Sequence, residues 1–200
     1  MKRLVIISLA FLLGACSSID TKPVDQASVR VTIEGQDRIR FSGKGAGAGM
    51  MMSASMGSMG IAIGVAIDES ISKEIHESFI ASGGDFSEIV RLATDAWLSK
   101  ACQENKDGFN KLCLANTALN VRVYRYGFVT TSGENDPIKA ELDIGFIVVD
   151  QSEIKLNLTE FDDAPKAPLE KAKKDGQISD DLLTSGYQAL LEAFYGKFAE

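Results

Sequence analysis

Few residues of this chain have the type and spacing that catalysis requires. A hydrolytic site needs a nucleophile with a base within reach, and the only histidine of the chain is His76. It follows Ile75 in an amphipathic pattern, which predicts a helix residue at the surface or at the boundary of the core. The Gly-x-Ser-x-Gly and His-Glu-x-x-His motifs are absent. We therefore expect no enzymatic activity, no metal and no cofactor.

Two acidic pairs could hold a cation, but their positions favour simpler roles. Asp162-Asp163 lies in a predicted loop and Asp180-Asp181 at a predicted helix start. Carboxylates in such places are solvated or act as caps that face the helix dipole. A calcium site at Asp162-Asp163 is the alternative.

The segment from Gly43 to Ala48 (GKGAGA) fits the Gly-x-Gly-x-x-Gly/Ala spacing of dinucleotide-binding loops. In that fold an acid about 20 residues later ends a second parallel strand. Here the corresponding acid, Asp68, lies inside a predicted helix. The glycines also continue as far as Gly64, so we interpret the motif as glycine-rich composition and expect no nucleotide.

Cys102 and Cys113 are the two cysteines of the body of the chain. In an oxidising compartment an even pair predicts a disulfide. The closed loop of about 12 residues would stabilise the fold by about 3 kcal/mol. A redox or metal pair is the alternative, but no Cys-x-x-Cys is present and His76 stands alone.

The N-terminus carries a targeting signal. Residues 4–13 form an apolar run of signal-peptide length that is too short to span a bilayer. The following residues, Leu13-Gly14-Ala15-Cys16, resemble the lipobox of bacterial lipoproteins. The resemblance implies cleavage after residue 15, acylation of Cys16 and, because Ser17 rather than aspartate follows, sorting to the outer membrane of a Gram-negative cell. A plain secretory signal is the alternative.

Removal of residues 1–15 takes away Lys2 and Arg3 and leaves 19 basic against 28 acidic residues, a net charge of −9. Such a charge excludes a nucleic-acid partner and an electrostatic attraction to anionic lipid. Residues 16–28 are expected to form a tether. Residues 29–200 have the length of a single domain with a core of its own.

Hydrophobic periodicity predicts a mainly antiparallel sheet with three helices packed on it, an α+β fold. The five expected strands cover residues 29–33, 38–41, 119–130, 138–149 and 154–158. The first two form a hairpin or two consecutive strands, and the last three an antiparallel meander. The expected helices run from the uncharged segment to the glycines at 83–84, from Asp85 as N-cap to Cys102, and from a cap at Ser179 or Asp180 to Phe198. The order is β-β-α-α-β-β-β-α, with 162–176 as a charged loop.

The stretches SEIVRLATDAWLSKAC, DGF, LNVRVYRYGFV, AELDIGFIVVD and LLTSGYQALLEAFYGKF cover most of residues 85–198. Their order resembles that of small outer-membrane lipoproteins of the YajG and CsgG type. The resemblance implies a domain that faces the periplasm, and in some members of the group assembly into rings. The glycine–methionine segment and the cysteine pair are departures from it.

Residues 45–67 contain no charged residue and consist mainly of glycine, alanine, serine and methionine. In one interpretation they form a close-packed helix that presents small residues to another helix of the domain or of a second subunit. In a second, the segment enters the membrane, aided by an adaptable methionine surface. In a third, it is a flexible loop. The candidate contact residues are Met50, Met51, Met52, Ser53, Met56, Gly57, Met59, Gly60 and Gly64, of which the serine and the glycines are expected on one helix face.

The sequence therefore predicts a lipid-anchored outer-membrane protein whose domain faces the periplasm. It would serve as a structural or assembly component through the segment 45–67, with itself or an envelope complex as partner. The alternative is an accessory lipoprotein that carries a small ligand or lipid in the cleft between sheet and helices.

Overall fold

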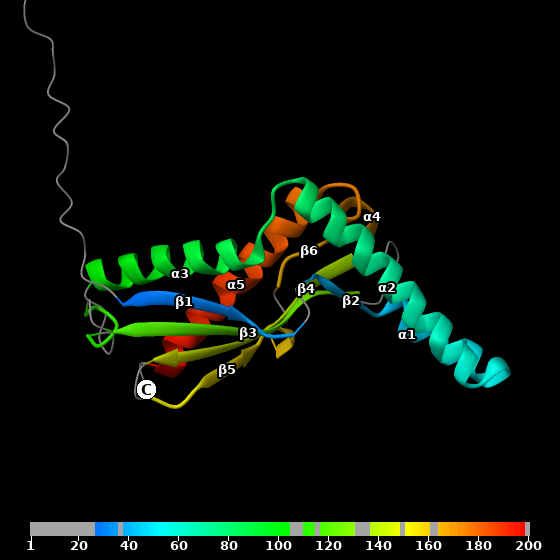
Figure 1. Cartoon of the computed structure of the whole chain (residues 1–200), viewed down its shortest axis with the longest axis horizontal. Coiled ribbons are helices and arrows are strands. Elements are labelled where there is room, and N and C mark those ends of the chain that lie inside the picture. Colours follow the sequence, from blue (N-terminus) through cyan, green and yellow to red (C-terminus); the bar gives the residue numbers. More distant parts are fainter. Residues whose placement is uncertain are drawn as a thin grey trace, which may run out of the picture.

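The computed structural model describes residues 27–35, 38–104, 110–114, 117–130, 137–148, 151–160 and 164–198. The predicted signal peptide, Cys16 and the tether up to residue 26 lie outside these ranges. Figure 1 shows a twisted sheet with long helices packed against it and a helical hairpin that projects from one end.

Two long central strands form the frame of the sheet. β3 (Ala118–Thr130) and β4 (Pro137–Val148) pair antiparallel along almost their whole lengths. β5 (Ile154–Asn157) and the short β6 (Lys166–Pro168) pair antiparallel with successive parts of β4. The predicted meander of three antiparallel strands is therefore confirmed. The sixth strand, β6, was missed because three residues are too few to show an alternation.

The sequence predicted that the first two strands form either a hairpin or two consecutive strands, and in the part of the chain that the structure describes they form no hairpin. β1 (Ser28–Ile33) and β2 (Arg40–Ser42) both run parallel to β3 and occupy successive parts of its edge. The break between them coincides with an irregularity of β3 between Val123 and Arg125. The second prediction, two consecutive strands, is correct, and the sheet is mixed although mostly antiparallel.

The helices outnumber the three that were predicted. α1 (Lys44–Met56) and α2 (Ser58–Ala81) form the hairpin, and α3 (Phe86–Gln103) and α5 (Gly176–Phe198) pack on the sheet. A single 3-10 turn, η1 (Leu158–Glu160), and the four-residue α4 (Leu169–Ala172) complete the described elements. The predicted loop 162–176 thus contains β6 and α4.

The start of α3 was predicted correctly from its side-chain cap. The Asp85 carboxylate accepts the Ser87 and Glu88 N–H groups, as expected for an N-cap. The last helix starts earlier than predicted, at Gly176, where the Asp175 side chain accepts the N–H of Gln177. A side chain at Gly176 would collide with the carbonyl of Ser78 in α2, so this extra turn is part of the packing between two helices.

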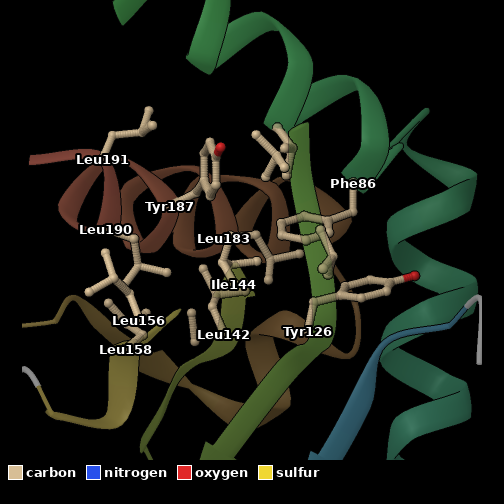
Figure 2. Close-up of a cluster of buried hydrophobic side chains, with 14 of the residues drawn as sticks. Phe86, Tyr126, Leu142, Ile144, Leu156, Leu158, Leu183, Tyr187, Leu190 and Leu191 are labelled. Carbon is tan, nitrogen blue, oxygen red and sulfur yellow. The ribbon is translucent and has the colours of Figure 1, made fainter. Parts of the chain in front are cut away.

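The core lies between one face of the sheet and the helices (Figure 2). Phe146 of β4 stacks on Phe194 of α5 with ring centres 4.5 Å apart, and Phe86 of α3 stacks on Tyr126 of β3 at 4.5 Å. All three predicted helical stripes contribute, since Ile75, Val90, Leu183, Tyr187 and Leu190 are fully buried. This core positions the second half of α2 and therefore the hairpin.

Candidate functional site

Residues 45–67 form most of an antiparallel pair of helices. The turn between α1 and α2 is Gly57, whose φ of 60° is a left-handed conformation that favours glycine. The prediction of a single helix with Ser53, Gly57, Gly60 and Gly64 on one face is wrong. Gly57 separates the two helices, and Ser53 lies on the opposite arm from Gly60 and Gly64.

The buried residues between the two arms are all glycines. Gly45 and Gly49 of α1 and Gly60 and Gly64 of α2 are the buried residues of this part of the hairpin. A Cβ atom at Gly64 would collide with the carbonyl of Gly45, and one at Gly60 would lie 2.5 Å from the backbone of Met52 and Ser53. The four glycines therefore allow the two backbones to approach more closely than any side chain would permit.

The base of the hairpin is held by one carboxylate. Asp68 of α2 accepts the backbone N–H of Gly43 at 3.2 Å and that of Gly45 at 2.6 Å. The amide groups at the start of α1 are thus satisfied by an anion from the chain itself. In a dinucleotide-binding loop these groups would face a pyrophosphate, so the structure supports the interpretation of GKGAGA as glycine-rich composition.

The outer surface of the hairpin is apolar. Met51 is 83% exposed and Met50 79%, and Val65 and Met59 are 65% and 61% exposed. Met56 and Ile61 are also exposed, whereas Met52 is half-buried. Six of the nine large exposed apolar residues in the described ranges therefore lie on this one element.

The hairpin continues directly into the domain because α2 is one unbroken helix. Its first half buries only glycines, whereas its second half buries Ile71, Ile75 and Phe79. The Ser72 hydroxyl donates to the carbonyl of Ile39 at 2.6 Å, next to β2. A rigid helix thus carries the apolar arms away from the core (Figure 1).

In the described part of the chain, His76 shares a cleft with Asp85 and Ser87, but the Asp85 carboxylate is occupied as the N-cap of α3. His76 is a half-buried residue of α2, as predicted, and its Nδ1 accepts the N–H of Ile39 at 3.5 Å. Within the described ranges, no group of three His, Cys, Asp or Glu side chains could hold a metal ion. Asp162-Asp163 lies outside those ranges, and Asp180-Asp181 lies in the first turns of α5, beside the Gln177 amide.

The disulfide prediction is confirmed. Cys102 at the end of α3 is bonded to Cys113, with Cα atoms 5.5 Å apart. The bond holds the turn that contains Leu112, whose side chain is fully buried and whose carbonyl accepts the N–H of Ala27 at 2.7 Å. The disulfide therefore fixes the point at which the chain enters the domain.

A charged cluster on the face of the sheet opposite the helices was missed. Arg122 of β3 contacts Glu34 at 2.9 Å, and the Tyr124 hydroxyl donates to Glu153 at 2.5 Å. Lys155 lies 4.3 Å from the centre of the Tyr124 ring. The alternation of β3 indicated a polar face, but it could not identify the partners on other strands. The opposite charges neutralise one another, and such exposed pairs contribute little stability.

No helix in the described part of the chain is both long enough and apolar enough to cross a bilayer.

The chain matches no protein-family model, no curated protein and no solved structure.

Proposed function

We propose that this chain is a lipid-anchored, non-catalytic component of the outer membrane, with its domain facing the periplasm and the α1–α2 hairpin as its contact element. The lipobox-like Leu13-Gly14-Ala15-Cys16 supports the anchor. The hairpin supports the contact role, because a large apolar surface on a projecting element needs a cover. This exposed apolar surface is the observation on which the proposal rests.

The hairpin is also separable from the core in energetic terms. Residues 46–66 bury only Gly49, Gly60 and Gly64, and every buried apolar side chain of α2 lies after them. Such an element adds almost no hydrophobic stabilisation to the domain. Its composition is therefore better explained by contacts outside the domain than by folding.

A small-ligand carrier remains the second candidate. A cleft of about 770 Å³ lies where α2 ends and α3 begins, beside β3. Its walls combine apolar and aromatic groups with the polar side chains of His76, Asp85 and Ser87. The lining includes Ile33, His76, Phe79, Ile80, Phe86 and Tyr126.

The test compares two chains that are secreted behind a cleavable leader and begin at Ser17, so that no acyl anchor is present. One chain is otherwise intact, and the other lacks residues 46–66. The Gly45–Asp68 contact places the two cut ends next to each other, so the deletion requires only a short linker. We expect the intact chain to co-sediment with envelope fragments and the deleted chain to stay soluble. Equal distribution of two folded chains would contradict the contact role.

A further inference from the structure

We propose that the hairpin inserts its tip into one leaflet of a phospholipid bilayer, so that lipid acyl chains cover the methionine surface. The inference rests on the proposed function, since the acyl anchor brings the domain to a membrane. It adds the chemical nature of the partner, which is a lipid surface and not a second protein.

Exposed apolar residues lie on both flanks of α2 and on the outer face of α1. At 100° per residue, Met59 and Ile63 flank the glycine face of α2 on one side, and Ile61 and Val65 flank it on the other. Met51 points away from the partner helix on α1 and is 83% exposed. A docked protein covers one side of such an element, whereas lipid covers all of them.

The packing of the hairpin is the reverse of that in a water-soluble helix pair. Soluble pairs bury large apolar side chains and expose polar ones, but here the glycines are inside and methionine, isoleucine and valine are outside. In water this arrangement gains little from the hydrophobic effect, and each glycine weakens a helix by about 1 kcal/mol. In lipid, close packing of backbones between small residues is a common way to associate helices.

Two of the three serine hydroxyls of the segment are satisfied within the hairpin. The hydroxyls of Ser53 and Ser55 donate back to the carbonyls of Met50 and Met52, at 2.8 and 3.2 Å. Within a bilayer each polar group needs a partner from the protein itself. These two side chains have such partners.

The length of the uncharged arms fits one leaflet. Gly45–Met56 and Ser58–Ile67 extend about 18 and 15 Å at 1.5 Å per residue, and one leaflet contributes about 15 Å of hydrocarbon. The nearest charged residues, Lys44 and Asp68, lie together at the base because Gly45 is bonded to Asp68. The hairpin therefore has an uncharged tip and a charged base at the depth where the headgroups would lie.

The tether allows the acyl group and the hairpin to reach the same membrane. The chain enters the domain at the end opposite the hairpin (Figure 1). The point of entry lies beside Ala118 of β3, and the end of β2 lies beside Val129 of the same strand. These two residues of β3 are about 36 Å apart along an extended strand. The 11 Cα-to-Cα steps from Cys16 to Ala27 can extend to about 36–40 Å at most. The extended tether therefore spans the length of the sheet, so that the acyl group and the hairpin can reach the same membrane.

The experiment uses the full lipidated chain in phosphatidylcholine vesicles, with the fluorophore NBD on Met51→Cys, on Ile61→Cys or, as a control, on Leu92→Cys. All three positions are more than half exposed, so labelling removes no core contact. Cys102 and Cys113 are bonded to each other and do not react. Flotation of the protein with the vesicles measures binding through the acyl anchor. Failure of the anchor is therefore distinguishable from failure of the hairpin to insert.

We expect lipid-attached doxyl groups to quench NBD at positions 51 and 61, and dissolved iodide not to. At position 92 we expect iodide alone to quench. Shielding of the label from both quenchers, together with disulfide cross-linking of the unlabelled cysteine variant to the same position of another chain, would overturn the proposal in favour of self-association. Quenching by iodide at positions 51 and 61 in floating vesicles would overturn it as well.

Discussion

The backbone N–H of Gly45 lies 2.6 Å from the carboxylate of Asp68, and this bond joins the two ends of the uncharged stretch. Asp68 also accepts the N–H of Gly43 at 3.2 Å. A segment that is continuous in sequence is thereby closed into a hairpin whose charges lie at its base. The long uncharged run is thus a consequence of two short arms side by side, and neither arm is long enough to span a membrane.

Replacement of Asp68 by alanine should loosen the first turn of α1. The change removes the acceptor of two amide groups, an effect typically of about 1–2 kcal/mol for a helix N-terminus. We expect faster hydrogen exchange in residues 44–56 and little change in the thermal midpoint of the domain. Glu77→Gln is the control, because Glu77 is an exposed residue of the same helix that pairs only weakly with Lys73, at 3.8 Å. Unchanged exchange in Asp68→Ala would contradict the role of this bond.

Two glycines of the hairpin should respond in opposite directions to the same substitution. Gly64→Ala places a methyl group against the carbonyl of Gly45, so the arms must separate and α1 should lose exchange protection. Gly47→Ala meets no atom within 4 Å and should stabilise α1 by up to about 1 kcal/mol through helix propensity. Hydrogen exchange of α1, measured by mass spectrometry in both variants, tests these two expectations. Equal protection in the two would show that the arms are not closely packed.

The elements of the domain could be predicted from the sequence wherever one clear period was present. Two examples are the alternation at Leu119, Val121 and Val123, which predicted a strand, and the helical stripe from Ile71 to Phe79, which predicted a helix. The direction of β1 could not be predicted, because strand alternation is the same whether a neighbour runs parallel or antiparallel. It depends on contacts with β3, about 90 residues away.

The candidate site was predicted in composition but not in shape. Small residues indicated close helix packing, but the sequence did not show that Gly57 would adopt a left-handed turn and direct the glycines toward one another. A glycine can continue a helix or end it, and the packing of Gly64 against Gly45 decides between the two. The role of Asp68 was missed because its partners are backbone amide groups.

Loss of the disulfide should destabilise the domain without affecting the hairpin. The double variant Cys102→Ser, Cys113→Ser releases a loop of about 12 residues, which corresponds to about 3 kcal/mol of unfolding free energy. The bonded turn holds Leu112 and the entry point at Ala27, far from α1. Urea unfolding and hydrogen exchange should therefore show a lower midpoint and an unchanged α1. Equal stability of variant and wild type would contradict the prediction.

The stability of the domain should fall at alkaline pH because of Tyr187. Burial raises the pKa of its hydroxyl above the usual value, and its hydrogen bond with Thr94 at 2.7 Å offsets part of that rise. Below about pH 10 both the folded and the unfolded state keep the proton. Above it only the unfolded state loses the proton, so the free energy of unfolding decreases as the pH rises.

The variant Tyr187→Phe checks this dependence. It should be less stable at neutral pH by about 1 kcal/mol, the typical value of one hydrogen bond, but should lose less stability between pH 9 and about 11. Tyr195→Phe retains Tyr187 and should keep the wild-type slope. Parallel pH profiles for Tyr187→Phe and the wild type would argue against burial of this hydroxyl as the cause.

The most direct test of the central claim, that the outer face of the hairpin is covered in the envelope, uses the methionines themselves. Apart from Met1, which belongs to the predicted signal peptide, all five methionines lie between residues 50 and 59, so their oxidation to the sulfoxide reports on the hairpin alone. Outer membranes would be treated with chloramine-T, a charged oxidant, and the reference would be the same protein in urea. Leu92→Met supplies an exposed methionine on α3, outside the hairpin. We predict slow oxidation of Met50 and Met51 and fast oxidation at position 92. Equally fast oxidation at all three positions would contradict the account.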